Sequence, residues 1–414
     1  MLPTGLSIRT TTLLAQTGPG GSVAAVAILG PAAPAKDAAG ILKAYRAEVG
    51  TEAEQNAAML ARTKASEKAL AQARKAPEAE VIRQINRMNQ YLKAMEKLGI
   101  DATVRPNVLT IATGKDGLTL QATRGDNRLA IAADRIAQID TGGGADALTV
   151  QADRVGTIST DRPDSRADRD IDREAQGNDA LAIAARIVRS IELGGGNDVL
   201  AAQTQMIFAD LGAGNDVAAI TTDIALGVAG GAGDDVITLT ASLGGSAARR
   251  LTETADGTPI AAAQAAATLY ADTATRLAAA AAAANTADVD GGGGNDVIAV
   301  SGALMIGVAG GAGDDLIRVE GRTVALHYGQ GDGKDVVAIG AGTDVLVQLA
   351  ARPDGGSDPK GFTVERDADR MILRFAGGSI TFTGVQQAGT IAIARGFGAA
   401  EILSTPAPPV DLLL

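Results

Sequence analysis

The stretch GVAGGAGDD occurs at residues 227–235 and again at 307–315, and the fold is decided there. Each copy is followed by a short apolar run, VITLT after the first and LIRVE after the second. Glycine tolerates positive φ angles, so this stretch can turn the backbone tightly and leave carbonyl oxygens pointing outward. The apolar runs indicate β-strands that start directly after each turn. Because the same loop sequence occurs twice, we predict a repeating structure.

Further copies of the loop share a common period. Written as G-G-x-G-x-D-x-U-x, with U a large apolar residue, the motif occurs in full at 230–238, 291–299 and 310–318. Near matches begin at residues 141, 193, 211 and 330, and a weaker match begins at 174. The aspartates in the sixth place are separated by 33, 19, 18, 19, 61, 19 and 20 residues. They are Asp146, Asp179, Asp198, Asp216, Asp235, Asp296, Asp315 and Asp335.

The common spacing of these aspartates fits two half-turns of nine or ten residues in a parallel β-solenoid. The two long gaps contain insertions, a charged segment at about 160–175 and an alanine-rich block at about 246–288. Strand-like runs such as LTIAT and LTLQAT begin near Val108, before the first clear loop. We therefore expect a mainly β protein with a parallel β-roll over residues 106–350. The alanine-rich block is expected to form a helix, around 260–284, that stands off the roll.

Glycine and aspartate at this spacing point to calcium. Stacked strands of a parallel sheet lie about 4.8 Å apart, and calcium takes six to eight oxygens at 2.3–2.6 Å. An ion between two stacked loops would therefore reach carbonyl oxygens and carboxylates from both. Without the ion the row of carboxylates repels itself, so we expect folding and calcium binding to be coupled. The predicted ligand residues are Gly194, Gly196, Asp198, Gly212, Gly214, Asp216, Gly231, Gly233, Asp235, Gly292, Gly294, Asp296, Gly311, Gly313, Asp315, Gly331, Gly333, Asp335, Asp146 and Asp179.

Two details of this arrangement follow from the sequence. The valine or isoleucine after each aspartate is expected to point into a narrow core, where β-branched residues pack well. Most half-turns between the loops lack the motif, as in TTDIALGVA, so calcium is expected mainly on one side of the roll. Asp344, in GAGTD at 340–344, follows Asp335 by nine residues. It is therefore expected to face the other side, without a partner loop.

The loops resemble the glycine- and aspartate-rich nonapeptide repeats of RTX (hemolysin-type calcium-binding) proteins, over roughly residues 140–345. The resemblance implies a calcium-loaded parallel β-roll. Residues 361–384, GFTVERDADRMILRFAGGSITFTG, alternate apolar and polar in three short runs. That pattern predicts an antiparallel capping segment within 351–400, and it is similar to the segment that follows the repeats in many hemolysin-type proteins.

The tail 401–414 ends in PAPPVDLLL, with Asp411 before three leucines. It is similar to the uncleaved C-terminal signals of type I secretion substrates. The resemblance implies export by a type I secretion apparatus and a place outside the cell or on its surface. Calcium near millimolar outside cells would then complete folding after export.

Composition narrows the classes of function. The chain has 414 residues, with 48 Asp and Glu against 37 Lys and Arg, giving a formal net charge of −11. This charge argues against a nucleic-acid partner and suits a protein that collects cations. Cysteine is absent, which excludes disulfides and thiolate metal sites. No apolar run reaches the roughly 20 residues that span a bilayer.

The N-terminal region, 1–105, differs from the rest. Segments 51–76 and 78–98 are rich in Ala, Glu, Lys and Arg and predict two helices separated by Pro77. The second carries an apolar stripe at helical spacing, which indicates either packing within this chain or a coiled-coil contact with another subunit. The stripe consists of Val81, Ile85, Met88, Leu92 and Met95.

A catalytic motif is absent from the sequence. It contains no H-E-x-x-H, no G-x-S-x-G and no phosphate-binding G-x-x-x-x-G-K-[ST]. The single histidine, His327, is interpreted as a wall residue of the last turns. We therefore expect no enzyme but a secreted, calcium-binding protein with a structural, surface-layer or adhesion role, whose partners are a cell surface or further copies of itself.

Three other interpretations remain open. The first is a secreted enzyme with an unrecognised catalytic part in the first 105 residues. The second is a stack of Asx-Gly turns that binds no metal, because Gly, Asn and Asp are favoured in turns for other reasons. The third, an ice-binding solenoid, would need regular threonine rows opposite the loops, and QMIFAD and ALMIGV do not supply them.

Overall fold

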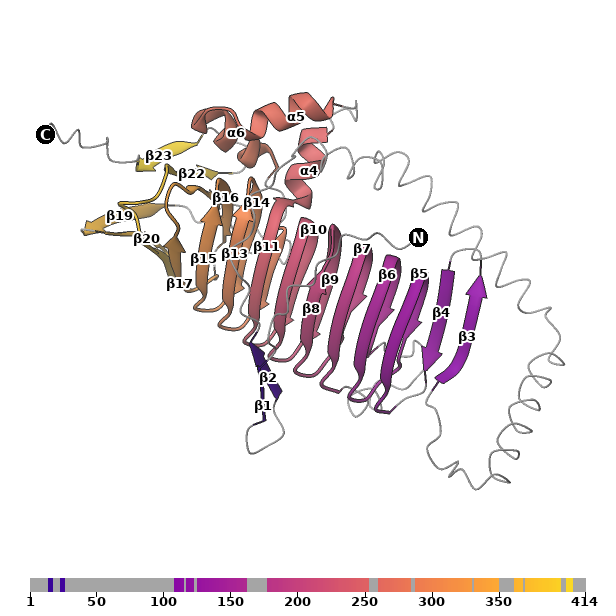
Figure 1. Ribbon diagram of the computed structural model, residues 1–414. Helices are drawn as coiled ribbons and strands as arrows, with labels where there is room; N and C mark the ends of the chain where they lie inside the picture. The colour runs from indigo at the N-terminus through magenta and orange to yellow at the C-terminus, as the bar shows by residue number, and fades with distance from the viewer. Residues whose placement is uncertain are drawn as a thin grey trace, which may run out of the picture.

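The computed structural model describes residues 14–17, 23–26, 108–114, 117–122, 125–161, 177–252, 260–283, 287–329, 331–349, 361–367, 369–395 and 400–404. These residues form a mainly β protein in which most strands pair in parallel. Figure 1 shows the strands stacked side by side, with β3 and β4 at one end and β19 to β23 at the other. The helices expected at 51–76 and 78–98, and the tail from residue 405, lie outside the described residues.

The stack begins with an antiparallel pair that leads into three long parallel strands. The pair is β3 (Val108–Gly114) and β4 (Gly117–Ala122), and the long strands are β5 (Arg128–Asp140), β6 (Ala147–Ser159) and β7 (Ala180–Glu192). A separate antiparallel pair consists of β1 (Leu14–Thr17) and β2 (Val23–Val26).

From β7 onward the strands form two series, each parallel within itself. Strand β7 pairs with β8 through its first half and with β9 through its second half, and β10 likewise contributes to both series. The first series is β8 (Val199–Gln203), β10 (Val217–Ala232), β11 (Val236–Gly244), β13 (Val297–Ala303), β15 (Leu316–Gly321) and β17 (Lys334–Ile339). The second is β9 (Met206–Ala213), β10, β12 (Val289–Gly293), β14 (Ile306–Ala312), β16 (Thr323–Tyr328) and β18 (Asp344–Leu349).

The strand register repeats the aspartate spacing of the sequence. Ala180 pairs with Val199 and Val217 pairs with Val236, and in both pairs the partners are one repeat apart. Ala147 pairs with Ala180 across the charged insertion. Consequently each glycine-aspartate loop lies directly against the loop of the preceding repeat.

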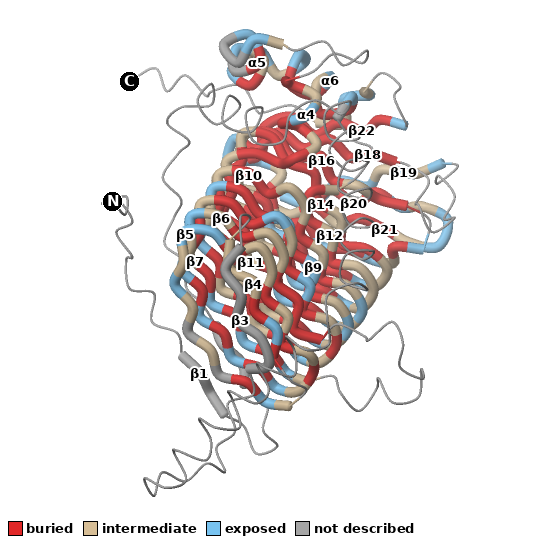
Figure 2. The backbone as a smooth tube through the Cα atoms, turned by 90° about the vertical axis from the view of Figure 1, so that its right-hand side faces the viewer, coloured by how far each residue is buried: buried red, intermediate tan, exposed pale blue. Residues whose placement is uncertain are grey.

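A narrow apolar core lies between the two series. Along β15 and the first four residues of β11, buried residues alternate with exposed or half-buried ones, and Figure 2 shows buried and exposed positions alternating around the stack. The residue directly after each aspartate proves to be the outward one. Leu316 is 48% exposed, whereas the next residue, Ile317, is fully buried. The expectation that the first apolar residue points into the core is therefore wrong by one position, because strand residues alternate between faces.

The C-terminal strands close the far end of the stack. β19 (Phe362–Asp367), β20 (Arg370–Phe375) and β21 (Gly378–Thr383) pair in antiparallel order, and β21 also pairs in parallel with β17. β22 (Ile391–Arg395) pairs in parallel with β18 and in antiparallel with β23 (Glu401–Ser404).

The alanine-rich insertion packs against the strands. It contains three helices, α4 (Gly245–Thr252), α5 (Ala262–Leu269) and α6 (Thr273–Ala283). Buried residues of these helices form a second apolar cluster with residues of β10, β16 and β18, and Figure 1 shows β10 and β16 beneath the helices. The expectation of one helix standing off the roll is therefore wrong. Helices α4 and α6 contact the strands, α5 contacts α4 and α6, and Leu251, Leu269 and Leu277 are buried in the resulting cluster. None of the described helices is long and apolar enough to cross a membrane.

Candidate functional site

The glycine-aspartate loops line one edge of the stack, which we call the loop edge. Each loop connects a strand of the second series to the next strand of the first series. The insertion leaves after β11 and returns before β12, so α4 to α6 lie at the opposite edge, the insertion edge.

Glycine is required at the loop edge for two reasons. All twelve predicted ligand glycines have positive φ, between 90° and 143°. In addition, a Cβ on Gly292 would lie 2.0 Å from the carbonyl oxygen of Gly231, and one on Gly231 would lie 1.8 Å from that of Gly212. The carbonyl oxygens thus point along the stack from one loop toward the next. Gly331 is an exception, since nothing lies within 4 Å of its added Cβ.

The predicted aspartates form a continuous chain of hydrogen bonds, the aspartate ladder. The Oδ1 atom of each accepts a hydrogen bond from the backbone N–H of the aspartate one loop earlier, at 2.8 Å for Asp216 to Asp235 and for Asp235 to Asp296. The same bond joins Asp146, Asp179, Asp198, Asp216, Asp235, Asp296, Asp315 and Asp335 in order. The structure therefore brings all eight predicted aspartates into one row.

The second carboxylate oxygen is left without a regular hydrogen bond. In the described part of the chain, the Oδ2 atoms of six ladder aspartates are buried and accept no hydrogen bond of regular geometry. Such atoms are costly, because a buried polar group without a partner loses its hydration. The six residues are Asp146, Asp179, Asp198, Asp216, Asp235 and Asp296. The hydroxyls of Thr141 and Thr160 lie close enough to Asp146 and Asp179 to lower their pKa.

In the later loops these oxygens face carbonyl groups. The position that a Cβ on Gly230 would take lies 2.4 Å from Asp235 Oδ2 and 2.4 Å from the carbonyl oxygen of Gly291. The same point on Gly291 lies 2.3 Å from both Asp296 Oδ2 and the carbonyl oxygen of Gly310. Each carboxylate oxygen is thus less than two Ca–O bond lengths from a carbonyl oxygen of the next loop. A cation of the size of calcium could contact both oxygens of such a pair.

Burial makes the ladder carboxylates weak acids. It raises the pKa of Asp179 to about 8, and that of Asp198, Asp235 and Asp296 to about 7. Neighbouring carboxylates add to this rise, while the accepted backbone N–H groups lower the pKa. Near neutral pH these carboxyl groups therefore gain and lose protons readily.

A second ladder, which the sequence reasoning did not identify, runs along the exposed side of the loops. Asn197 Oδ1 accepts from the N–H of Asn215 at 2.8 Å, and Asn215 Oδ1 accepts from the N–H of Asp234 at 3.0 Å. These residues stand directly before the ladder aspartates, and their bonds run in the opposite direction. The Asn-Asp and Asp-Asp doublets of the motif were the available signal. Its members are Asp126, Asn178, Asn197, Asn215, Asp234, Asn295 and Asp314.

At both ends of the row of loops, a side chain of the protein donates hydrogen bonds to the oxygens of the terminal loop. At the first end Asn127 takes the aspartate position, and its Nδ2 donates to the Thr141 carbonyl oxygen at 3.1 Å and to Asp146 Oδ1 at 3.0 Å. At the other end the Tyr328 hydroxyl donates to the Gly333 carbonyl oxygen at 2.8 Å, and its ring stacks on Phe375. The RGDN sequence before β5 is therefore a further, altered loop that the motif search missed.

Buried aspartates at the insertion edge are fully supplied with donors. Asp288 accepts from the N–H of Ser246 at 2.8 Å, from its hydroxyl at 2.9 Å and from the N–H of Gly307 at 2.8 Å. Asp344 accepts from the N–H of Thr390 at 2.8 Å and forms a buried ion pair with Arg276. Asp344 thus lies away from the loop edge as expected, but α6 supplies the partner that we did not expect.

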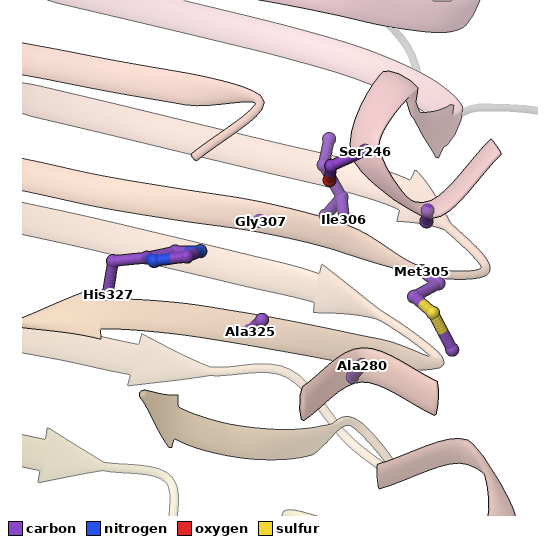
Figure 3. A pocket seen from close by; sticks show the side chains of 8 residues that line it. Ser246, Ala280, Met305, Ile306, Gly307, Ala325 and His327 are labelled. Atoms are coloured by element: carbon purple, nitrogen blue, oxygen red, sulfur yellow. The ribbon is translucent and has the colours of Figure 1, made fainter. Parts of the chain in front are cut away.

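His327 lies on β16 beside a small apolar cavity (Figure 3). The cavity is lined by Met305, Gly307 and Ala325 among others. Burial lowers the pKa of His327 to about 4, so the ring is neutral near pH 7. The histidine belongs to the wall beneath α4.

The side chains alone do not make a metal centre. Among the described residues, no three His, Cys, Asp or Glu side chains come close enough to hold a metal ion. A cation at the loop edge would therefore depend on one or two carboxylates together with glycine carbonyl oxygens. Hard oxygen donors of this kind suit calcium.

Comparisons with known proteins return no relatives. No protein-family model, no curated protein and no solved structure matches the chain.

Proposed function

We propose that this chain is a secreted, calcium-binding protein of the RTX type, in which the two series of strands form a parallel β-roll held at the loop edge by calcium. Its role would be structural, as a surface-layer, matrix or adhesion component. The single observation that carries the proposal is the row of buried Oδ2 atoms without regular hydrogen bonds. A cation bound beside each of these Oδ2 atoms would offset the cost of burying it. The spacing of about 4.8 Å between stacked loops allows one calcium ion to contact both.

Calcium fits the available ligands better than a transition metal would. The oxygens are carboxylates and main-chain carbonyls, which are hard donors. The residues that would hold the ions are the ladder aspartates and the glycines at the second and fourth places of each loop. Bound calcium would supply positive charge between loops whose carboxylates otherwise repel one another.

The two ends of the row support this interpretation. At the first loop an amide nitrogen of Asn127 donates to the carbonyl and carboxylate oxygens of the next loop. At the last loop the Tyr328 hydroxyl donates to a glycine carbonyl. The chain thus places its own donors where the row of loops ends. Between them the described residues give no regular hydrogen bond to the buried Oδ2 atoms of the six ladder aspartates named above.

A stack of bare turns is the competing interpretation, with protons on the ladder carboxylates instead of calcium. The raised pKa values of Asp179 and Asp235 are compatible with it in the absence of metal. A calcium titration followed by far-ultraviolet circular dichroism separates the two, with magnesium as the control ion. We expect a cooperative gain of β signal between roughly 10⁻⁴ and 10⁻³ M calcium. A chain that is already β-rich in chelator and does not respond to calcium would contradict the proposal.

Variants make the same test specific to the loops. Asp235→Asn and Asp296→Asn each remove one ladder charge but keep an oxygen for the backbone N–H. We expect each to shift the midpoint of the calcium titration at least several-fold to higher calcium. Asp223→Asn is the matched control, because Asp223 is a partly buried carboxylate on β10 outside the loops. An equal shift in the control would assign the effect to net charge.

A further inference from the structure

Asp161 stands where the neighbouring loops have glycine. Ser159 pairs with Asp140 on one side and with Glu192 on the other, so two residues later Asp161 aligns with Gly142 and Gly194. A Cβ on Gly194 would lie 2.4 Å from the Cβ of Asp161. Asp161 thus occupies the second place of its loop, at the start of the charged insertion that the sequence predicted.

The Asp161 carboxylate points into the loop edge. Only 7% of the residue is exposed. Its Oδ2 accepts a hydrogen bond from the N–H of Gly177 at 2.9 Å, on the far side of the insertion. Its Oδ1 is buried and makes no hydrogen bond of regular geometry among the described residues, although the N–H groups of Gly195 and Gly144 lie near the carboxylate and lower its pKa. A carboxylate oxygen without a regular hydrogen bond is unfavourable at this depth unless a cation joins it.

The Asp161 carboxylate lies close enough to three ladder aspartates, Asp146, Asp179 and Asp198, for charge repulsion between them to affect their pKa values. Asp161 raises the pKa of Asp179 and of Asp198, and Asp146 in turn raises that of Asp161. All three also carry a buried Oδ2 atom without a regular hydrogen bond. Four carboxyl groups, each with one buried oxygen that lacks a regular hydrogen bond, therefore lie along this part of the loop edge, although no three of them converge at one point. Elsewhere the second place of the loop is glycine and adds no carboxylate.

We propose that Asp161 is a ligand of a divalent cation held between the loops at 141–146 and 193–198, and that this is the tightest calcium site of the chain. The inference rests on the proposed function, since it assumes that the loops bind calcium. Because no three acidic side chains converge among the described residues, the ion would take one or two carboxylates with loop carbonyls. A second carboxylate raises calcium affinity relative to loops that offer one.

A purely structural role for Asp161 makes a different prediction. In that case the carboxylate only ties residue 161 to Gly177 across the insertion. Asp161→Asn separates the two roles, because an asparagine oxygen still accepts the Gly177 N–H but carries no charge. The structural role predicts unchanged calcium binding in this variant, and the ligand role predicts the loss of one site.

The test is isothermal titration calorimetry of the full chain with calcium. We expect Asp161→Asn to lose one high-affinity equivalent or to weaken the tightest site at least tenfold. Asp223→Asn should retain it. An identical titration for Asp161→Asn and the parent protein would overturn this inference and leave the proposed function intact. A parent protein that binds no calcium at all would overturn both.

A second measurement needs no variant and so does not depend on whether Asp161→Asn folds. Crystals of the parent protein grown with terbium, which replaces calcium, would locate the ions by anomalous scattering. The inference requires a peak within coordination distance of Asp161 Oδ1. Peaks confined to the glycine loops from 211 onward would overturn it.

Discussion

The two edges of the stack treat buried aspartates in opposite ways. At the insertion edge Asp288 and Asp344 receive backbone N–H groups, a serine hydroxyl and an arginine. At the loop edge Asp235 and Asp296 receive one N–H each and keep a second oxygen without a donor. The residue type and the depth are the same, so the difference lies in what the chain itself provides. The protein supplies donors to the carboxylates at the insertion edge, whereas the ladder carboxylates at the loop edge keep buried oxygens to which the described residues give no regular hydrogen bond.

The comparison also explains why the insertion packs where it does. Arg276 on α6 reaches Asp344 on β18 and donates to Thr323 on β16 at 3.2 Å. The guanidinium is therefore an internal cation that spans two neighbouring strands of the second series. We therefore expect the insertion edge, which contains its own positive charge, not to depend on calcium.

Calcium removal should produce the largest effect and should act on one edge first. A site filled at about 100 times its Kd contributes about 2.7 kcal/mol. Several sites together would shift the melting temperature by on the order of tens of degrees. We expect hydrogen exchange in mild chelation to lose protection first at the ladder amides of Asp216 and Asp235. The amides of Gly307 and Thr390 should stay protected longer. Simultaneous loss at both edges would contradict the distinction between them.

Removing the Arg276 guanidinium should have the next largest effect on stability. Arg276→Ala leaves Asp344 buried without its charge partner, which costs about 3–5 kcal/mol in known cases. The matched control is Arg318→Ala, which removes an exposed ion pair with Glu320 and should cost less than about 1 kcal/mol. Thermal melts in saturating calcium measure both variants.

Arg276→Ala should also leave the calcium midpoint almost unchanged, because the loop edge is not touched. A large shift of that midpoint would show that the two edges are coupled. A cost as small as that of Arg318→Ala would mean that the ion pair contributes little.

The glycines provide a sharper test of loop geometry. Gly292→Ala forces an alanine into a backbone conformation with φ of 105°, which residues with a side chain rarely adopt. It also places a Cβ atom 2.0 Å from the Gly231 carbonyl oxygen. Backbone strain alone costs about 1–3 kcal/mol. Gly293→Ala is its neighbour and control, since a Cβ there meets nothing within 4 Å. Urea unfolding of both variants in calcium should show a clear loss for the first and almost none for the second. Equal losses would mean that the close approach between loops is not required.

The sequence was sufficient for the repeating part of the molecule. Strand period, loop positions and the row of eight aspartates follow from the common spacing of the motif, because a parallel register aligns whatever repeats at that interval. The inward face of each strand was harder to predict. Apolar residues stand at two successive positions after the loop, as in Val236 and Ile237, and either could have been the inward residue.

The parts that escaped prediction depend on single long-range partners. Arg276 and Asp344 are 68 residues apart, and Ser246 and Asp288 are 42 apart, so no periodicity links them. Asp161 was assigned to a charged insertion because only the strand register shows that it replaces a loop glycine. Asn127 was missed because asparagine breaks the motif, although it precedes Asp146 by the common repeat spacing.

The smallest expected effect is a pH dependence that differs with and without calcium. Ladder aspartates such as Asp179, Asp198 and Asp235 have pKa values raised by burial to about 7 or 8, above the unfolded value of 3.8. A raised pKa in the folded state means that stability is present at low pH and is lost as pH rises through the folded pKa. The metal-free protein should therefore melt on the order of 5 °C lower at pH 8.5 than at pH 5.5.

Calcium should remove or reverse this trend, because the ion binds the ionised carboxylates and binding releases their protons. Melts at both pH values, in chelator and in saturating calcium, supply the four temperatures needed. A metal-free protein whose melting temperature does not change over this range would mean that the ladder carboxylates titrate normally. In that case the open oxygens would be in contact with water, and the loop edge would have no more need of a cation than the insertion edge has.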